Sequence, residues 1–479
     1  MSATARAIAG NTLSQIVVRA VDVAVGIVTL GFITRYLGLY GFGEYTTANA
    51  VLQFASILVD FGLYLTFLRE ISASPPEEHG RITNNIFTLR ALTALLALVA
   101  AVALTAVLPY PPVVRAGVAL LAASYLFGSF ISTLTAPFQK HLLMSRVALV
   151  NLFNRLLLFA FVVIVVALNA GLLALFIATS VSSLLSFIVL VFLLRLLPNP
   201  LRLNFAWDIA YWREIFHKTW PIAVTTILNL IYFKADTIIL SLYRPQEDVG
   251  IYGASYKVLE ILTTFPHMFM GLMLPLLTAA WIARDHTRVQ RLLEHSFSLF
   301  AFLTLPLIGG TLVVGRSLMT LIAGSDFTES GSVLMVLMIA TAAIFFGTLY
   351  TYMVIVLDKQ RAVVKYFFMT ALISIIGYFI LIPRYSYWGA AWMTVASEIM
   401  IIVGAWLTVR RELSMKLPLR RLTRIVLASV LMMIVALFLS RSLSVIPVIG
   451  ISIVVYVLSA FILRAFSFAE LKQLILKTE

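Results

Sequence analysis

Long apolar runs recur along the whole sequence and are separated by short polar segments. A run of about 20 apolar residues is long enough to cross the hydrocarbon core of a bilayer as an α-helix. Strand-like alternation of apolar and polar positions is absent, so the pattern favours helices over a membrane β-barrel. It predicts fourteen spans, at residues 10–34, 43–66, 84–108, 113–136, 147–168, 172–194, 219–242, 250–276, 295–315, 332–356, 363–382, 388–408, 424–440 and 445–463.

Composition supports this interpretation. Hydrophobic residues make up 61% of the 479 residues and charged residues only 12%, which excludes an ordinary soluble enzyme. There is no cysteine, hence no disulfide and no thiol-based metal or redox site. The first apolar run is too long for a cleaved leader, so we expect it to be a retained span. The excess of basic residues is expected to face an anionic membrane surface, not nucleic acid.

The charges of the connecting segments indicate the orientation. Of the 35 Lys and Arg residues, 23 fall in the segments on the side that holds both termini, and six fall on the opposite side. Cytoplasmic segments of membrane proteins carry the excess of Lys and Arg. The sequence therefore predicts a multi-pass protein of the cell membrane with both termini in the cytoplasm.

Charged residues also occur inside the predicted spans, where each is costly. We weigh two interpretations: structural ion pairs buried in the bundle, and the polar lining of an aqueous cavity. Arg90 and Lys365 lie near the cytoplasmic ends of their spans. Their long side chains can instead place the charged groups at the membrane–water interface. The cations are Arg19, Arg90, Arg155, Lys234, Lys257 and Lys365, and the acids are Asp22, Asp60, Asp236, Glu260 and Glu398.

The longest cytoplasmic segment lies between the sixth and seventh spans. Within it, Phe205, Ile209, Trp212 and Phe216 follow helical spacing. This pattern predicts a helix lying in the membrane interface, with Trp at headgroup depth. Its place in the chain suits a linker between two bundles.

A short repeat links the two halves of the chain. Phe42-Gly43-Glu44-Tyr45 and Val249-Gly250-Ile251-Tyr252 share an apolar-Gly-x-Tyr pattern, 207 residues apart. Both stretches follow an outer segment and begin an inward-running span. Repeats that run in the same direction are related by an axis along the membrane normal.

The N-terminal region resembles a known family. Gly10-Asn11-Thr12, Arg35-Tyr36-Leu37-Gly38, Phe42-Gly43-x-Tyr45, Asp60-Phe61-Gly62-Leu63 and Leu68-Arg69-Glu70 are similar to the signature of the polysaccharide (oligosaccharide) flippases, of the multidrug/oligosaccharidyl-lipid/polysaccharide exporter superfamily. The resemblance implies an all-α polytopic fold with two six-helix lobes related by a pseudo-twofold along the membrane normal, plus two C-terminal helices. The expected domains are an N-lobe at 1–197, a linker helix at 198–218, a C-lobe at 219–412 and the additional helices and tail at 413–479.

The resemblance implies export of polyprenyl-diphosphate-linked oligosaccharide by alternating access. Such a substrate needs cations that hold its diphosphate, and Arg is suited to bidentate contact. We expect Asp22, one turn after Arg19, to keep that arginine charged and oriented. The expected substrate-binding residues are Arg19, Arg90, Arg155, Lys234 and Lys257, and the expected ion-coupling or orienting residues are Asp22, Asp60, Asp236, Glu260 and Glu398.

Other functions stay open at this point. A cation-coupled drug or metabolite antiporter of the same superfamily would favour acids in its cavity, and the charged residues named above are six cations against five acids. A flippase for the peptidoglycan lipid precursor is a second alternative. A membrane enzyme is disfavoured, because no large loop, metal-type cluster or phosphate-binding glycine loop is present. We expect no cofactor and no metal. The expected partners are the lipid-linked oligosaccharide, the bilayer, and a polysaccharide polymerase and glycosyltransferases.

Overall fold

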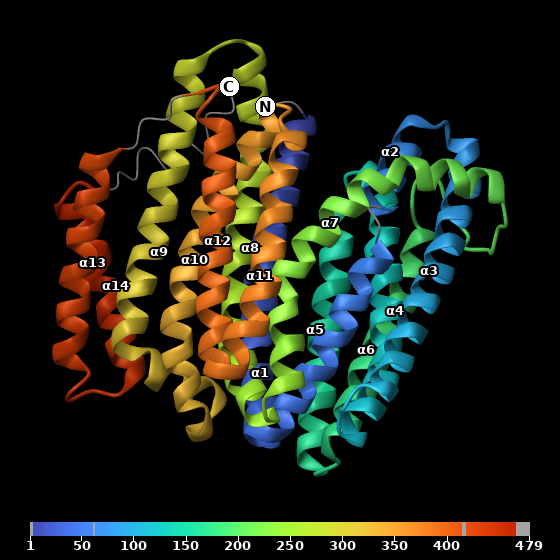
Figure 1. Cartoon of the computed structure of the whole chain (residues 1–479). Helices are drawn as coiled ribbons and strands as arrows, with labels where there is room; N and C mark the ends of the chain where they lie inside the picture. The colour runs from blue at the N-terminus through green and yellow to red at the C-terminus, as the bar shows by residue number, and fades with distance from the viewer. Residues whose placement is uncertain (1–2, 61–62, 414–417, 466–479) are drawn as a thin grey trace. The chain divides into compact units, whose positions relative to one another are not determined.

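The computed structural model describes residues 3–60, 63–413 and 418–465, and within them it describes residues 3–17, 19–20, 57–60, 218 and 220–233 by their backbone only. All regular structure in these ranges is helical, with two short 3₁₀ turns, η1 (Pro76–Glu78) and η2 (Ser325–Phe327). Figure 1 shows the helices in chain order. They are α1 (Ala3–Asp60), α2 (Leu63–Ala73), α3 (His79–Val107), α4 (Pro112–Lys140), α5 (Met144–Ala167), α6 (Gly171–Leu194), α7 (Ile209–Tyr243), α8 (Gln246–Ile282), α9 (His286–Ala323), α10 (Thr328–Val356), α11 (Gln360–Tyr385), α12 (Tyr387–Val409), α13 (Leu419–Leu439) and α14 (Val445–Ile462).

Twelve helices in the described part of the chain are long and apolar enough to cross a membrane. The helical membrane architecture predicted from the sequence is thus confirmed. The exact number of fourteen spans stays a prediction. Two predicted spans share α1, which is broken at Gly38 by a left-handed backbone (φ 63°, ψ −174°) that glycine adopts without strain. The middle of α7 is described by its backbone only.

The chain divides into two compact units, residues 1–250 and 251–479. In the first unit α1 packs on α4 and α5, and α4 packs on α6. Buried side chains of α1, α3, α4 and α6 form one apolar core there, including Leu52, Val114, Leu121 and Phe176. Helix α7 packs on α1, α2 and α3, so the compact division falls near the start of α8, not at the linker before α7.

In the second unit α10 packs on both α9 and α12. It is the most enclosed helix, with 83% of its most apolar window buried. Helices α13 and α14, which match the two additional helices expected from the sequence, pack on each other and on α9 (Figure 1). Tyr456 of α14 donates a hydrogen bond of 2.7 Å to the carbonyl of Phe302 in α9.

The linker before α7 follows one polar face of α3. The backbone N–H of Asn204 donates to Asn84 Oδ1 (3.0 Å), and that of Ala206 donates to Thr88 Oγ1 (2.9 Å). Asn84 and Thr88 lie one helical turn apart, so they present their acceptors on the same side of α3. The linker is therefore fastened to the first unit through its backbone.

The helix predicted from Phe205 begins later in the structure, and its position in the membrane interface stays a prediction. Residues 201–208 are irregular, and α7 begins at Ile209 and continues to Tyr243 as one helix of 35 residues. Trp212 donates its indole N–H to the Asn85 carbonyl (3.2 Å), so it points toward α3. The cause is tertiary, because α3 supplies acceptors for backbone groups that a helix would otherwise satisfy internally.

Candidate functional site

An ion pair between α1 and α5 lies inside the apolar part of the first unit. The Nε of Arg155 donates to Oδ1 of Asp22 at 3.0 Å. The Asp22 side chain is 11% exposed and that of Arg155 is 37% exposed. Both residues were expected at the site, but Asp22 was expected to orient Arg19. The side chain of Arg19 lies outside the described residues, and the partner of Asp22 that the structure brings from another helix is Arg155.

Local sequence makes room for this pair. Gly26 follows Asp22 by one helical turn on α1, and a Cβ there would lie 3.6 Å from Cζ of Arg155, in ordinary van der Waals contact. A larger side chain at this position would reach the guanidinium. The terminal nitrogens of Arg155 make no hydrogen bond to another described residue. The pair thus fixes the guanidinium through Nε and leaves its fork open, which is the geometry that binds a phosphate bidentately.

Two other predicted residues have structural partners in the first unit. Arg90 on α3 is buried, and its Nε donates to Ser129 Oγ of α4 at 3.1 Å. Asp236 on α7 is fully buried and accepts hydrogen bonds from the backbone N–H and the hydroxyl of Thr237. These contacts fit the alternative of structural polar groups held inside the bundle. Lys234, two residues before Asp236, is half-buried.

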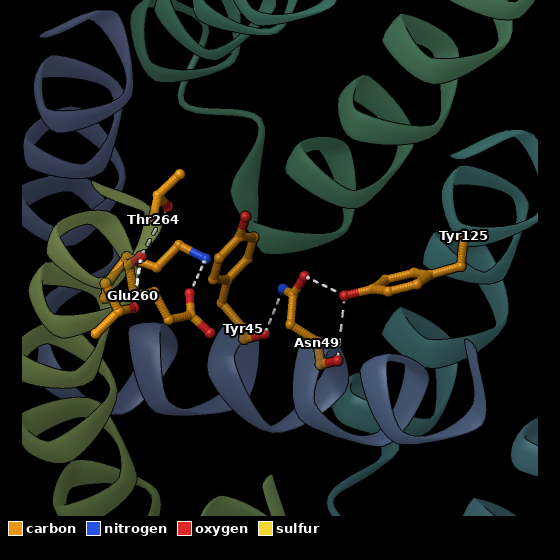
Figure 2. A network of polar contacts seen from close by, with 7 residues as sticks. Tyr45, Asn49, Tyr125, Glu260 and Thr264 are labelled. Atoms are coloured by element: carbon orange, nitrogen blue, oxygen red, sulfur yellow. Dashed lines mark hydrogen bonds and ion pairs between the residues drawn. The ribbon is translucent and has the colours of Figure 1, made fainter. Parts of the chain in front are cut away.

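Lys257 and Glu260 form an ion pair on α8 in the second unit. Lys257 Nζ lies 2.8 Å from Glu260 Oε2, and the side chains are 48% and 23% exposed. The backbone carbonyl of Glu260 accepts from Thr264 Oγ1 at 3.2 Å (Figure 2). The i,i+3 spacing noted in the sequence therefore does bring these two charges together.

The remaining predicted acids are placed as follows. Glu398 lies in the middle of α12 and is 6% exposed. The side chain of Asp60 lies outside the described residues. A buried acid that the sequence interpretation missed is Glu44 on α1, which is 7% exposed. It was missed because it is the second residue of the predicted span 43–66, and a charge so near the end of a span is ordinarily solvated.

A polar network in the first unit was also not expected. Tyr125 of α4 donates to both the backbone carbonyl and the side-chain oxygen of Asn49 (3.2 Å each), and Asn49 Nδ2 donates to the Tyr45 carbonyl at 2.8 Å (Figure 2). The Tyr45 ring stacks on Phe176 with centroids 5.7 Å apart. No sequence signal pairs Asn49 with Tyr125, since 76 residues separate them.

Among the described residues no group of three or more His, Cys, Asp or Glu side chains gathers as a metal site would require. What the arrangement offers is a half-exposed arginine within membrane-spanning helices, oriented by a buried carboxylate. That combination can hold an anionic group at a depth where free ions do not go.

Comparison with known proteins identifies relatives of the chain, a solved structure with a similar fold and the family. The chain is 23% identical over 211 residues to the capsular polysaccharide biosynthesis protein CapF of Staphylococcus aureus, and the match spans 44% of this chain and 53% of that protein. It is 20% identical over 404 residues to a protein named as an O-antigen transporter of Shigella dysenteriae, covering 82% of this chain and 98% of that one.

A solved structure has a similar fold. The lipid II flippase MurJ, in an inward closed conformation, superposes with a TM-score of 0.75 at 12% identity, over 96% of this chain and 99% of that one. The family model described as polysaccharide biosynthesis protein matches residues 8–281, which is more than half of the chain. These 274 residues run from the start of α1 through α8 and include Asp22 and Arg155. The chain therefore belongs to the polysaccharide biosynthesis protein family.

Proposed function

We propose that this protein is a flippase that moves polyprenyl-diphosphate-linked oligosaccharide from the cytoplasmic to the outer leaflet by alternating access. The single observation that carries the proposal is the open guanidinium fork of Arg155, held by Asp22 within membrane-spanning helices. A diphosphate is the part of such a substrate that a bidentate arginine recognises. Membership of the family and the named activities of its relatives point to the same substrate class.

The finer features belong to the same proposal. The protein has two six-helix lobes related by a pseudo-twofold, two additional C-terminal helices and both termini in the cytoplasm. It acts by transport and not by catalysis, and it hands its substrate to a polysaccharide polymerase after glycosyltransferases have built it. Arg19, Lys234 and Lys257 provide further cations along the path of the headgroup.

A reconstituted assay tests the proposal. Purified protein in proteoliposomes is supplied with a fluorophore-tagged polyprenyl-diphosphate disaccharide, and an impermeant quencher reports how much tag reaches the outer face. We expect transport by the wild type and its loss in Arg155→Ala. The lost charge-assisted contact is worth about 1.5–3 kcal/mol, which is roughly 10- to 100-fold in binding. Arg155→Lys keeps the charge but not the fork, so we expect an intermediate rate.

The matched control is Arg316→Gln. Arg316 also faces an acid, with its Nη2 3.4 Å from Glu329 Oε2, but it lies near the end of α9 with an exposed side chain. We expect transport by this variant to equal that of the wild type. Uptake of a lipophilic cationic dye in place of the lipid-linked sugar would contradict the proposal and favour the antiporter. Preference for a tagged peptidoglycan precursor would instead favour a flippase for that precursor.

A further inference from the structure

Glu398 occupies an unusual environment in the second unit. It lies midway along α12 between Tyr387 and Val409, and it is 6% exposed. Among the described residues its carboxyl group makes no hydrogen bond and no ion pair. A buried carboxylate without partners is strongly disfavoured, whereas the neutral acid is tolerated far better.

The packing of α11 against α12 gives the level of this carboxyl along the bundle. A Cβ on Gly377 would meet the sulfur of Met393, and a Cβ on Gly404 would meet the Cβ of Tyr366. These two contacts define an antiparallel register, which places Glu398 at the level between Thr370 and Ser374 of α11. Both of these residues are buried. The Ser374 hydroxyl is itself buried without a hydrogen-bond partner in the described structure.

The nearest hydroxyl donors on α12 are already used. Ser397 Oγ donates to the Thr394 carbonyl (2.8 Å), and Thr394 Oγ1 donates to the Ala390 carbonyl (2.9 Å). A second contact of Thr394 is to the hydroxyl of Tyr252 on α8, at 3.2 Å. The hydroxyl protons of Thr394 and Ser397 therefore serve the backbone and do not stabilise a negative charge on Glu398.

Charged groups on the neighbouring helices are either distant from this level or paired with each other. On α11 the only cation near this level is Lys365, which is exposed and lies over the Tyr366 ring, 5.0 Å from its centroid. It stands two helical turns from the level of Glu398. On α8, Tyr252 contacts Thr394, and the charges nearest to that contact along the helix are Lys257 and Glu260, which pair with each other at 2.8 Å. The remaining titratable side chains of α8, α10 and α11 near this level are the phenols Tyr252, Tyr256, Tyr350, Tyr366 and Tyr378.

We propose that Glu398 is a proton-binding site, which holds a proton in the present state and exchanges it with water when the transport cycle opens this layer of the second unit. The step is an acid dissociation, in which the carboxylic acid gives a carboxylate and a proton. Inward release of that proton would drive outward movement of the substrate. This inference rests on the proposed function for its role in coupling, but the site itself does not.

The first experiment tests the site on the purified full-length protein without any substrate. Infrared difference spectra between acidic and alkaline buffer report the C=O stretch of protonated carboxylic acids. We expect a band from a buried acid in the wild type and its loss in Glu398→Gln. The matched control is Glu412→Gln, since Glu412 is an exposed acid paired with Lys359 at 2.8 Å. That variant should keep the band. Identical spectra for wild type and Glu398→Gln would overturn the proposal.

The second experiment tests coupling. Proteoliposomes carrying the tagged polyprenyl-diphosphate disaccharide are placed under an imposed pH gradient or an imposed sodium gradient. We expect the pH gradient to stimulate the wild type and to have no effect on Glu398→Gln, while Glu398→Asp retains part of the stimulation because it keeps a carboxyl. Stimulation by sodium alone, or an undiminished pH response in Glu398→Gln, would contradict a proton site. If no protein moves the lipid while the infrared band remains, the proposed function fails and the site stands.

Discussion

Gly43 and Gly250 make reciprocal contacts in the first unit. A Cβ on Gly43 would come within 1.7 Å of the Gln246 carbonyl oxygen, and a Cβ on Gly250 within 2.3 Å of the Leu39 carbonyl oxygen. Each glycine thus packs on the residue four positions before the other, and both pairs have the 207-residue offset of the sequence repeat. A reciprocal contact of this kind is what a local two-fold axis produces. It supports the proposed relation between the repeats.

Gly43→Ala and Gly250→Ala should therefore each destabilise the protein. Backbone atoms cannot move aside as the end of a flexible side chain can. We therefore expect the loss in free energy of unfolding to reach or exceed the roughly 1–3 kcal/mol that overpacking usually costs. Thermal melting of the purified protein in detergent measures it. Gly128→Ala is the control, because a Cβ at Gly128 of α4 meets nothing within 4 Å. Equal melting temperatures for Gly250→Ala and Gly128→Ala would show that the glycines are not needed for the close approach.

The Asp22–Arg155 pair should be energetically coupled. A double-mutant cycle with Asp22→Asn and Arg155→Gln, read by unfolding in detergent, is expected to give about 1 kcal/mol, because the half-exposed arginine weakens the interaction. The exposed pair Lys359–Glu412, with an N–O distance of 2.8 Å, should give less. Additive effects at Asp22 and Arg155 would mean that the two side chains do not hold each other.

The size of the side chain at position 26 should control the position of the Arg155 guanidinium. Gly26→Ala is expected to be tolerated, since its Cβ lies at ordinary contact distance from Arg155. Gly26→Leu should displace the guanidinium and reduce transport of the tagged lipid in proteoliposomes, with little change in the amount of inserted protein. Full transport by Gly26→Leu would argue that the position of Arg155 does not matter.

Attachment of the linker should depend on pH through Asp208. The pKa of Asp208 lies below its usual value, first because its carboxylate accepts the backbone N–H of Tyr211 and then because it pairs with Arg81. A lowered folded-state pKa means that the stabilisation is fully present above the unfolded value of about 4 and is lost as pH falls through the lower folded value. Limited proteolysis should therefore cut residues 201–217 faster in strong acid.

Asp208→Asn serves as the comparison for this pH effect. Asparagine still accepts the Tyr211 N–H as a helix cap, at the position where Asp208 Oδ1 now accepts it at 3.0 Å. It cannot titrate, so the acid-dependent increase in cleavage should disappear. An unchanged pH profile in this variant would assign the effect to another group.

The orientation can be read by cysteine labelling, because the chain has no cysteine of its own. Thr328→Cys, at the start of α10, is expected to react with an impermeant reagent added outside intact cells. Arg411→Cys, just after α12, should react only after the membrane is opened. The basis is the concentration of basic residues on the side that contains Arg411. The reverse labelling pattern would invert the proposed topology.

The helical membrane class and most helix positions could be predicted from the sequence alone. These follow from hydropathy along the chain, because every backbone polar group in hydrocarbon must be satisfied within its own segment. The sequence also indicated that Asp22, Arg155 and Glu398 were costly where they stood, since the cost of a charge depends on depth and not on its partner. The 207-residue repeat was visible as well, and the glycines in it proved to be where backbones approach.

The hydrogen-bond and ion-pair partners of these residues could not be predicted in the same way, because they depend on tertiary packing. Asp22 pairs with a residue 133 positions away, and the linker gives up helix at 204–206 because side chains of α3 accept its backbone N–H groups. The absence of any described partner for Glu398 likewise depends on the packing, because the hydroxyl groups of Thr394 and Ser397 on α12 donate to the backbone. Such choices depend on how helices pack against one another, and hydropathy along one helix carries no information about the neighbour that it meets.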